Sequence, residues 1–178
     1  MIDTNFVNEV NALSEQTIQL CYHCHKCTAG CPVVEDMTYG PDRILRMVQF
    51  GERERLLSSH DIWVCASCET CGTRCPNDID IARVMDALRR MAVAEGAAVA
   101  EPDSVKFHRL FLGLIQRIGR MHEASLMGFY KLWTLHLMDD MDSGVKMIFK
   151  GKVPIIPHPI KGRGDVKRIF EATSSEEK

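Results

Sequence analysis

Eight cysteines in two matching runs carry the chemistry that this sequence suggests. The runs are CYHCHKCTAGCP at 21–32 and CASCETCGTRCP at 65–76, and both follow the pattern C-x2-C-x2-C-x3-C-P. Cysteine thiolates are soft ligands of the kind that iron–sulfur clusters prefer. Three cysteines spaced three apart can wrap three corners of a cubane, and the run occurs twice. The sequence therefore predicts two [4Fe–4S] clusters.

The fourth cysteine of each run is fixed by the proline after it and sits too far along the chain to close the same cube. Where such runs occur in pairs, this cysteine ligates the other cluster. The crossing would tie the two runs together, so that cluster assembly and folding are coupled. We assign one cluster to Cys21, Cys24, Cys27 and Cys75, and the other to Cys65, Cys68, Cys71 and Cys31.

Three other uses of the cysteines fit the pattern less well. Zinc sites need only four ligands, in CxxC pairs held apart by a longer segment. The motif at 21–25 also satisfies C-x-x-C-H, the haem attachment pattern, but the second run has no such histidine. Disulfides placed to staple a fold would be spread along the chain, whereas all eight cysteines lie between Cys21 and Cys75.

Four polar residues inside the runs invite a second interpretation. His23 and His25 could tune the potential of the first cluster by hydrogen bonding or couple a proton to it. The alternative is that both are solvent-facing loop residues. Lys26 and Arg74 are predicted to be surface charges, although a nearby cation would raise the potential of a cluster.

No further chemical machinery is evident in the sequence. All eight cysteines are used as ligands, and the chain has neither G-x-G-x-x-G for a dinucleotide nor H-E-x-x-H for zinc. We therefore expect no substrate chemistry in this chain alone. Electrons would arrive from one partner and leave to another.

Composition narrows the setting in which the chain works. The 178 residues carry a formal net charge of −2, with lysine and arginine spread along the chain, which argues against nucleic acid as a partner. The first residues lack the basic and apolar regions of a secretory signal. No run of about 18 uncharged apolar residues is present, so we expect no membrane span and a cytoplasmic location.

The elements that must position the cysteines are predicted to be helices, and the fold class is mainly α. A short helix at 3–13 carries Phe6, Val7, Val10 and Leu13 on one stripe. A second begins at Pro41 and precedes Gly51, with Ile44, Leu45 and Val48 on one face. A third is capped by Asp80, carries Ile81, Val84, Met85, Leu88 and Met91, and ends near Gly96. The insert at 32–64 should also be helical.

Residues 1–98 are thus expected to form an N-terminal helix and a dicluster domain, and 99–178 a helical extension. In the extension, Asp103 or Ser104 would start a helix that Gly119 ends or kinks, and a second helix would span 122–138. A short third helix follows Asp142. The proline-rich segment 152–160 should be extended, and the polar tail after Phe170 frayed.

The whole chain resembles the C-type iron–sulfur subunits of heterodisulfide reductases. The residues that carry the resemblance are CxxCxxCTAGCP with YGPDRILRMV, then DIWVCASCETCGTRCPNDIDIARVMDALR, FHRLFLGLIQRIGRMHEASLM and GKVPIIPHPIKGRGDVKRIF. The paired motifs also resemble the α-helical ferredoxin fold. The resemblance implies an iron–sulfur relay subunit of an oxidoreductase complex, which receives electrons from a flavin and iron–sulfur subunit (A-type). It would pass them to a disulfide-reducing subunit (B-type).

Under this resemblance, the segment around Gly119 and Arg120 and the proline-rich segment would be docking surfaces. Two other interpretations stay open. The chain could be a free dicluster ferredoxin serving many partners, although eighty additional helical residues with apolar faces argue against that. It could also be the iron–sulfur subunit of a membrane-linked dehydrogenase, although the additional cysteine motifs of the succinate and glycolate types are missing.

Overall fold

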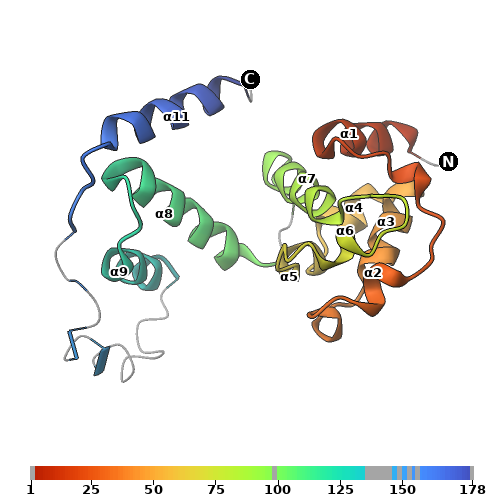
Figure 1. The fold of residues 1–178 in the computed structure, drawn as a ribbon, viewed down its shortest axis with the longest axis horizontal. Helices are drawn as coiled ribbons and strands as arrows, with labels where there is room; N and C mark the ends of the chain where they lie inside the picture. Colours follow the sequence, from red (N-terminus) through yellow and green to blue (C-terminus); the bar gives the residue numbers. More distant parts are fainter. Residues whose placement is uncertain are drawn as a thin grey trace. The chain divides into compact units, whose positions relative to one another are not determined.

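The computed structural model describes residues 3–97, 100–134 and 157–176, together with 146, 147, 150, 151 and 154. The chain divides into two compact units, Met1–Glu101 and Pro102–Lys178. The described part is helical and contains no β-strand, which confirms the predicted mainly α class (Figure 1). No helix in these ranges is long and apolar enough to cross a membrane.

Helix α1 (Thr4–Ser14) begins as the sequence predicts. The carboxylate of Asp3 caps it by accepting hydrogen bonds from the backbone N–H groups of Asn5 and Phe6, both at 3.1 Å. Phe6, Val7 and Val10 are buried, but Leu13 is 43% exposed, so its place on the buried stripe was wrong. Ser14 lies one full turn after Val10 and occupies that place, with its hydroxyl donating to the Val10 carbonyl at 2.6 Å.

Helices α3 (Pro41–Gln49) and α7 (Ile81–Ala94) confirm the two helices predicted after the cysteine runs. Pro41 is the first residue of α3, and the Asp80 side chain caps α7 by accepting from the Arg83 N–H at 3.1 Å. Gly96, with φ of +62°, follows the end of α7. The predicted apolar faces are buried: Ile44, Leu45 and Val48 on α3, and Ile81, Val84, Met85, Leu88 and Met91 on α7.

The core of the first unit lies between these helices. Helix α1 packs against α3 and α7, and the insert supplies α4 (Arg53–Leu57) and α5 (Asp61–Val64), which also pack against α7. Leu56, Leu57 and Ile62 are almost fully buried there. Each such side chain contributes about 1.5–3 kcal/mol by leaving water. The remaining turns are short 3-10 segments, η1 (Ile18–Leu20) and η2 (Val34–Asp36).

The second unit contains α8 (Pro102–Ile118), α9 (Glu123–Thr134) and α11 (Arg163–Glu176), and α8 packs against both others. Helix α8 begins at Pro102, before the two predicted starting residues, because proline suits the first helical position. It ends before Gly119, whose φ is +85°, as predicted. The predicted continuation of α9 from 135 to 138 lies outside the described residues.

Helix α11 was not predicted, and the expected fraying after Phe170 was wrong, since the helix continues to Glu176. Ion pairs one turn apart offset its polar composition: Arg168 with Asp165, and Lys167 with Glu171 at 3.6 Å. The helix predicted after Asp142 lies outside the described residues except for 146 and 147. In the proline-rich segment, residues 154 and 157–160 are not helical.

Candidate iron–sulfur cluster site

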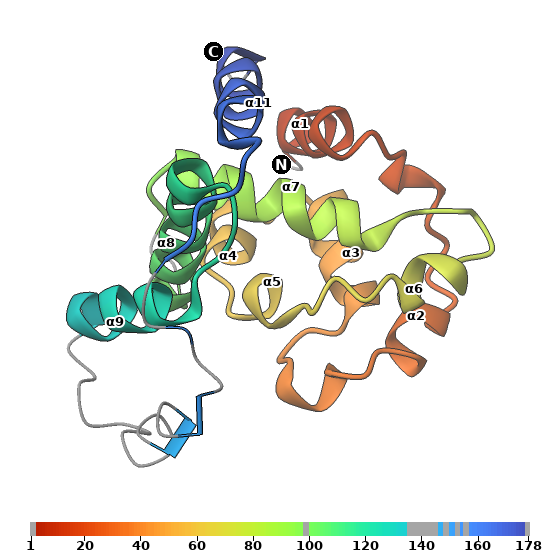
Figure 2. The same ribbon diagram turned by 60° about the vertical axis from the view of Figure 1, so that its left-hand side comes forward.

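The two cysteine runs fold alike. In each, a loop carrying the first two cysteines leads into a single helical turn that carries the third, α2 (Lys26–Ala29) in one run and α6 (Thr70–Thr73) in the other. The N–H of the fourth cysteine then closes a turn, from Cys31 to the Thr28 carbonyl in one run and from Cys75 to the Gly72 carbonyl in the other. Helices α2 and α6 pack against each other (Figures 1 and 2). The repeat in sequence is therefore a repeat in structure.

Both loops use the same left-handed backbone positions. The φ angles are +59° and +60° at His23 and His25, and +50° and +59° at the equivalent Ser67 and Glu69. A residue other than glycine in this region costs about 1–2 kcal/mol. Such turns direct successive N–H groups to one side and form concavities that bind anionic groups, iron–sulfur clusters among them. Glycine would adopt these turns without the energetic cost if they had only a structural role. The strained backbone is therefore better explained by the binding of an anionic cluster.

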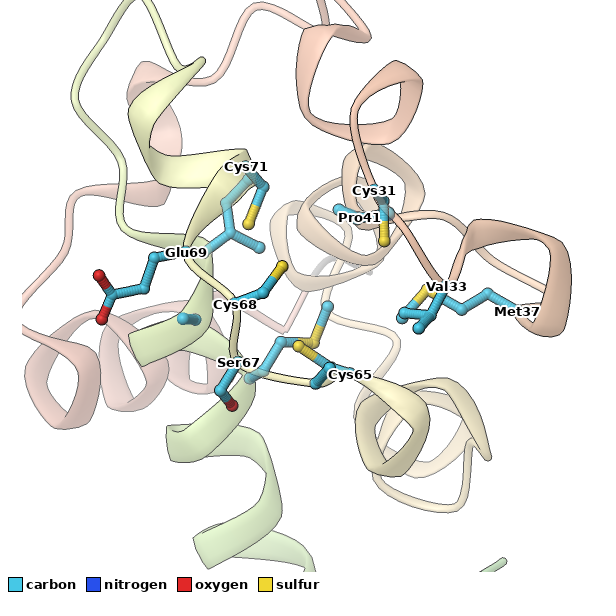
Figure 3. A pocket seen from close by; sticks show the side chains of 13 residues that line it. Cys31, Val33, Met37, Pro41, Cys65, Ser67, Cys68, Glu69 and Cys71 are labelled. Carbon is cyan, nitrogen blue, oxygen red and sulfur yellow. The ribbon is translucent and has the colours of Figure 1, made fainter.

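The fourth cysteine of the first run lies with the first three of the second run. Cys31, Cys65, Cys68 and Cys71 line one pocket, and their sulfurs point toward the space between them (Figure 3). Other described residues that line the pocket are mostly apolar: Val33, Met37, Pro41, Ala66, Ile81, Ala82 and Met85. Among the described side chains, no three His, Cys, Asp or Glu are grouped so as to hold a single metal ion. Four thiols from two chain segments around a mostly apolar pocket suit a cluster held at its corners.

The remaining four cysteines also interact across the two runs. Burial raises the pKa of Cys21, and the neighbouring Cys75 and Cys24 raise it further. Burial also raises the pKa of Cys27, with a smaller contribution from Cys21. Cys75 of the second run thus acts electrostatically on the first cysteine of the first run.

The thiols of the second run differ in how readily they ionise. Burial, followed by the charge of Cys65, raises the pKa of Cys71 to about 11. Hydrogen bonds with the hydroxyl and backbone N–H of Thr70 lower the pKa of the exposed Cys68. Only the thiolate binds metal, and a bound cation keeps a coordinating thiol deprotonated. The raised pKa of Cys71 means that its thiol is protonated at neutral pH in the cluster-free chain. Bound iron would supply the positive charge that keeps it deprotonated as a ligand.

A side chain from α3 holds the first loop. The amide nitrogen of Gln49 donates to the carbonyls of Ile18 at 3.0 Å and of Cys21 at 3.3 Å. Its amide oxygen lies 2.9 Å from Nε2 of His23. His23 is therefore hydrogen-bonded to α3 and is not a free solvent-facing residue. This link was not predicted, because a glutamine near the end of a helix carries no specific sequence signal.

A side chain from α7 holds the second loop in the same way. The guanidinium of Arg89 donates to the carbonyls of Ile62 and Cys65, to the hydroxyl of Ser67 at 3.3 Å, and to Asp86 at 2.9 Å. Only 15% of the Arg89 side chain is exposed. Sequence reasoning missed Arg89, although alignment of the two helices from their first residues places it opposite Gln49.

Two buried carboxylates brace the chain around the runs. Asp42 accepts from the hydroxyl of Thr28 and lies 2.8 Å from Nδ1 of His25, whose ring is otherwise exposed. Asp61 accepts from the backbone N–H groups of Thr38 and Tyr39 at 2.6 and 3.1 Å. His25 is thus both solvent-facing and hydrogen-bonded. Lys26 and Arg74 are exposed, as predicted.

Comparison with known proteins relates both cysteine runs to iron–sulfur proteins. Residues 20–80 match the family of the 4Fe-4S dicluster domain. Over 103 residues the chain is 36% identical to a C-type iron–sulfur subunit of the CoB–CoM heterodisulfide reductase of Methanocaldococcus jannaschii. The matched stretch is 53% of this chain and 55% of that protein, so the chain spans about half the length of this relative. Residues 20–80 are thus similar to the 4Fe–4S dicluster domain, and the chain is similar to a C-type iron–sulfur subunit of a heterodisulfide reductase.

Proposed function

We propose that this chain binds two [4Fe–4S] clusters through crossed cysteine ligands and carries electrons between partner proteins. The first site comprises Cys21, Cys24, Cys27 and Cys75, and the second site comprises Cys31, Cys65, Cys68 and Cys71. When bound, each cluster supplies one-electron redox chemistry. The observation that carries the proposal is that Cys31, from the first run, shares a pocket with three cysteines of the second run.

The protein supplies the surroundings that such clusters need. Left-handed loop residues form turns of the kind that bind anionic groups, and Gln49 and Arg89 hold the two loops from outside. Apolar side chains form most of the lining of the second site, and such a lining limits the access of solvent to a bound cluster. These features support the proposal that the chain works as an electron carrier within an oxidoreductase complex.

The similarity to the C-type iron–sulfur subunits supports a place in a complex of the heterodisulfide-reductase type. In that role, the chain would accept electrons from a flavin and iron–sulfur subunit (A-type). It would deliver them to a disulfide-reducing subunit (B-type). Residues 1–98 would be the electron-carrying domain and 99–178 a docking extension. Exposed large apolar side chains on α8 and α9 support the docking role: Leu112, Met127, Phe129, Leu132 and Trp133.

Anaerobic purification with counts of iron and acid-labile sulfide tests the cluster content. About eight of each per chain, with EPR signals that show spin coupling on full reduction, are expected for two neighbouring cubanes. About four of each, or zinc in place of iron, would contradict the proposal. Co-expression with an A-type and a B-type subunit then separates a member of such a complex from a free ferredoxin, since only the former co-elutes with both.

Two matched variants test the crossing of the ligands. Cys31→Ser should perturb the cluster whose other ligands lie in the second run, and Cys75→Ser the cluster whose other ligands lie in the first. The EPR spectrum of each variant should therefore lose or alter one signal, and the two variants should alter different signals. Double variants are the control: Cys31→Ser with Cys68→Ser should spare one cluster, whereas Cys31→Ser with Cys24→Ser should damage both. The opposite pattern would show that each run closes its own cluster.

A further inference from the structure

We propose that Arg89 and Asp42 set the order of the two reduction potentials, with the second site higher than the first. This inference rests on the proposed binding of two clusters. It does not follow from the cysteine motifs, which are the same in both runs. It depends on the different side chains that the two halves of the repeat place around otherwise equivalent loops.

The two halves provide matched positions for comparison. Helix α3 begins ten residues after Cys31 and α7 six residues after Cys75, but Gln49 and Arg89 are both the ninth residue of their helix. Each donates to the carbonyl of the first cysteine in its loop and to the carbonyl three residues earlier. Each also contacts the side chain two residues after that cysteine. The two side chains do the same structural work, but only Arg89 brings a positive charge.

The charge of Arg89 acts at short range on the second site. Two of its hydrogen bonds end on the carbonyls that flank the start of the second loop, and the guanidinium is largely shielded from water. Its ion-pair partner, Asp86, is 57% exposed and is therefore screened by solvent. A cation that is largely shielded from water favours the state with one more electron, because net charge and hydrogen bonding set cluster potentials. Arg89 therefore raises the potential at the second site.

Asp42 acts in the opposite sense on the first site. Its side chain is 8% exposed, and it accepts a hydrogen bond from Thr28, the residue after Cys27. The equivalent position in α7 is Ala82, which lines the pocket of the second site. The first site thus has a buried carboxylate where the second has a methyl group. A negative charge disfavours the added electron and lowers the potential at the first site.

One other buried charge, the carboxylate of Asp61, lies near the second site, and the three hydrogen bonds that it accepts from Thr38, Tyr39 and Ser59 offset its charge. The charges within the two runs are exposed and weaker in effect. Glu69 occupies the position equivalent to His25, and its carboxylate points away from the cysteine sulfurs (Figure 3). Lys26 is exposed as well, so solvent screens both. Arg74 precedes Cys75 and lies over Gly30, which precedes Cys31, so that it acts on both sites. The His25 ring shares a hydrogen bond with Asp42 and offsets its charge only when protonated.

The difference in potential between the two sites gives electron transfer through the domain a preferred direction. One-electron exchange between the two sites oxidises one and reduces the other. With Asp42 beside the first site and Arg89 beside the second, the added electron would favour the second site. A one-electron donor would then act at the first site, and a one-electron acceptor of higher potential at the second.

Redox titration of the cluster-loaded chain, followed by EPR, tests the proposal. The variant Arg89→Gln gives the second loop the same hydrogen-bonding side chain, glutamine, that holds the first loop. It should lower the higher of the two midpoint potentials. At a fixed solution potential, the ratio of reduced to oxidised cluster should fall by about tenfold, which corresponds to about 59 mV for one electron. The lower potential should move much less. A shift confined to the lower potential, or none at all, would overturn the inference.

Three further variants separate charge from structure. Arg89→Lys keeps the charge and should keep most of the higher potential. Gln49→Arg should raise the lower potential, and Asp42→Asn should raise it as well. If Arg89→Gln binds less iron, the last two variants decide, since an unmoved lower potential in both would refute the charge argument. A wild-type chain without two clusters would refute the proposed function itself, whereas two clusters with unmoved potentials would refute only this inference.

Discussion

Replacement of Asp61 by alanine should destabilise the first unit more than any other single loss of a polar side chain among the contacts described above. Asp61 is 1% exposed and begins α5. Its carboxylate accepts from the backbone N–H groups of Thr38 and Tyr39, and from the hydroxyl of Ser59 at 2.9 Å. These contacts hold the segment that links Cys31 to α3. Loss of Asp61 therefore affects the position of one proposed ligand of the second site.

The magnitude follows from the number of donors that lose their partner. A hydrogen bond to a charged group contributes about 1.5–3 kcal/mol, and a buried donor left unpaired costs about 1–3 kcal/mol. Thr38 is exposed, so its N–H can turn to water. The other two donors cannot do so without rearrangement. We expect a loss of about 3–5 kcal/mol for Asp61→Ala and about 1–2 kcal/mol for Asp61→Asn, which keeps one acceptor oxygen.

Thermal unfolding of the cluster-loaded chain at a fixed scan rate, followed by far-UV circular dichroism and visible absorbance, is the assay. For a unit of this size, each kcal/mol shifts the midpoint by about 4–8 °C, so Asp61→Ala should lower it by at least about 12 °C. Asp36→Ala, which removes an exposed carboxylate from the same insert, is the control and should stay within about 0.5 kcal/mol. Equal midpoints for the two variants would refute the reasoning.

Two further predictions concern the core and the thiols. Leu88→Ala on α7 removes a fully buried side chain and should cost about 2–5 kcal/mol in denaturant unfolding, whereas Val93→Ala, at an exposed position of the same helix, should cost less than about 1 kcal/mol. In the cluster-free chain at neutral pH, iodoacetamide followed by mass spectrometry should find Cys68 modified first and Cys71 among the last, because the pKa of Cys68 is lowered and that of Cys71 is raised to about 11. The rate at Cys71 should rise with pH toward that value, and equal rates at both thiols would contradict the geometry.

Much of the first unit could be predicted because its sequence signals are local. Pro41 at a first helical turn and Asp80 as a cap are chemical requirements of helix ends, and the structure has both. Leu13 was wrongly placed on the buried face of α1. Ser14 takes that place instead, because its hydroxyl is satisfied by a hydrogen bond to the Val10 carbonyl of the same helix. Helix α11 was missed because ion pairs, and not apolar periodicity, accompany its helical turns.

The cysteine ligands could be proposed from spacing alone, but the residues that surround them could not. Gln49 and Arg89 act through hydrogen bonds to backbone carbonyls that lie 24 to 31 residues away in sequence. No spacing rule relates a side chain to a distant carbonyl, so such contacts appear only when the chain is folded. The roles of His23 and His25 stayed open for the same reason, since their partners lie on α3.

The internal repeat explains why these distant residues matter most. The core positions of the two helices are interchangeable in kind, with Ile44 opposite Val84 and Val48 opposite Leu88, because both halves must bury the same face. Two identical halves would create two equivalent sites, and an electron would have no preference between them. A carrier between different partners needs a difference that leaves the fold unchanged. An arginine in place of a glutamine at one matched position supplies a charge and keeps the hydrogen bonds to the loop. It therefore gives electron transfer through the domain a preferred direction without repacking the core.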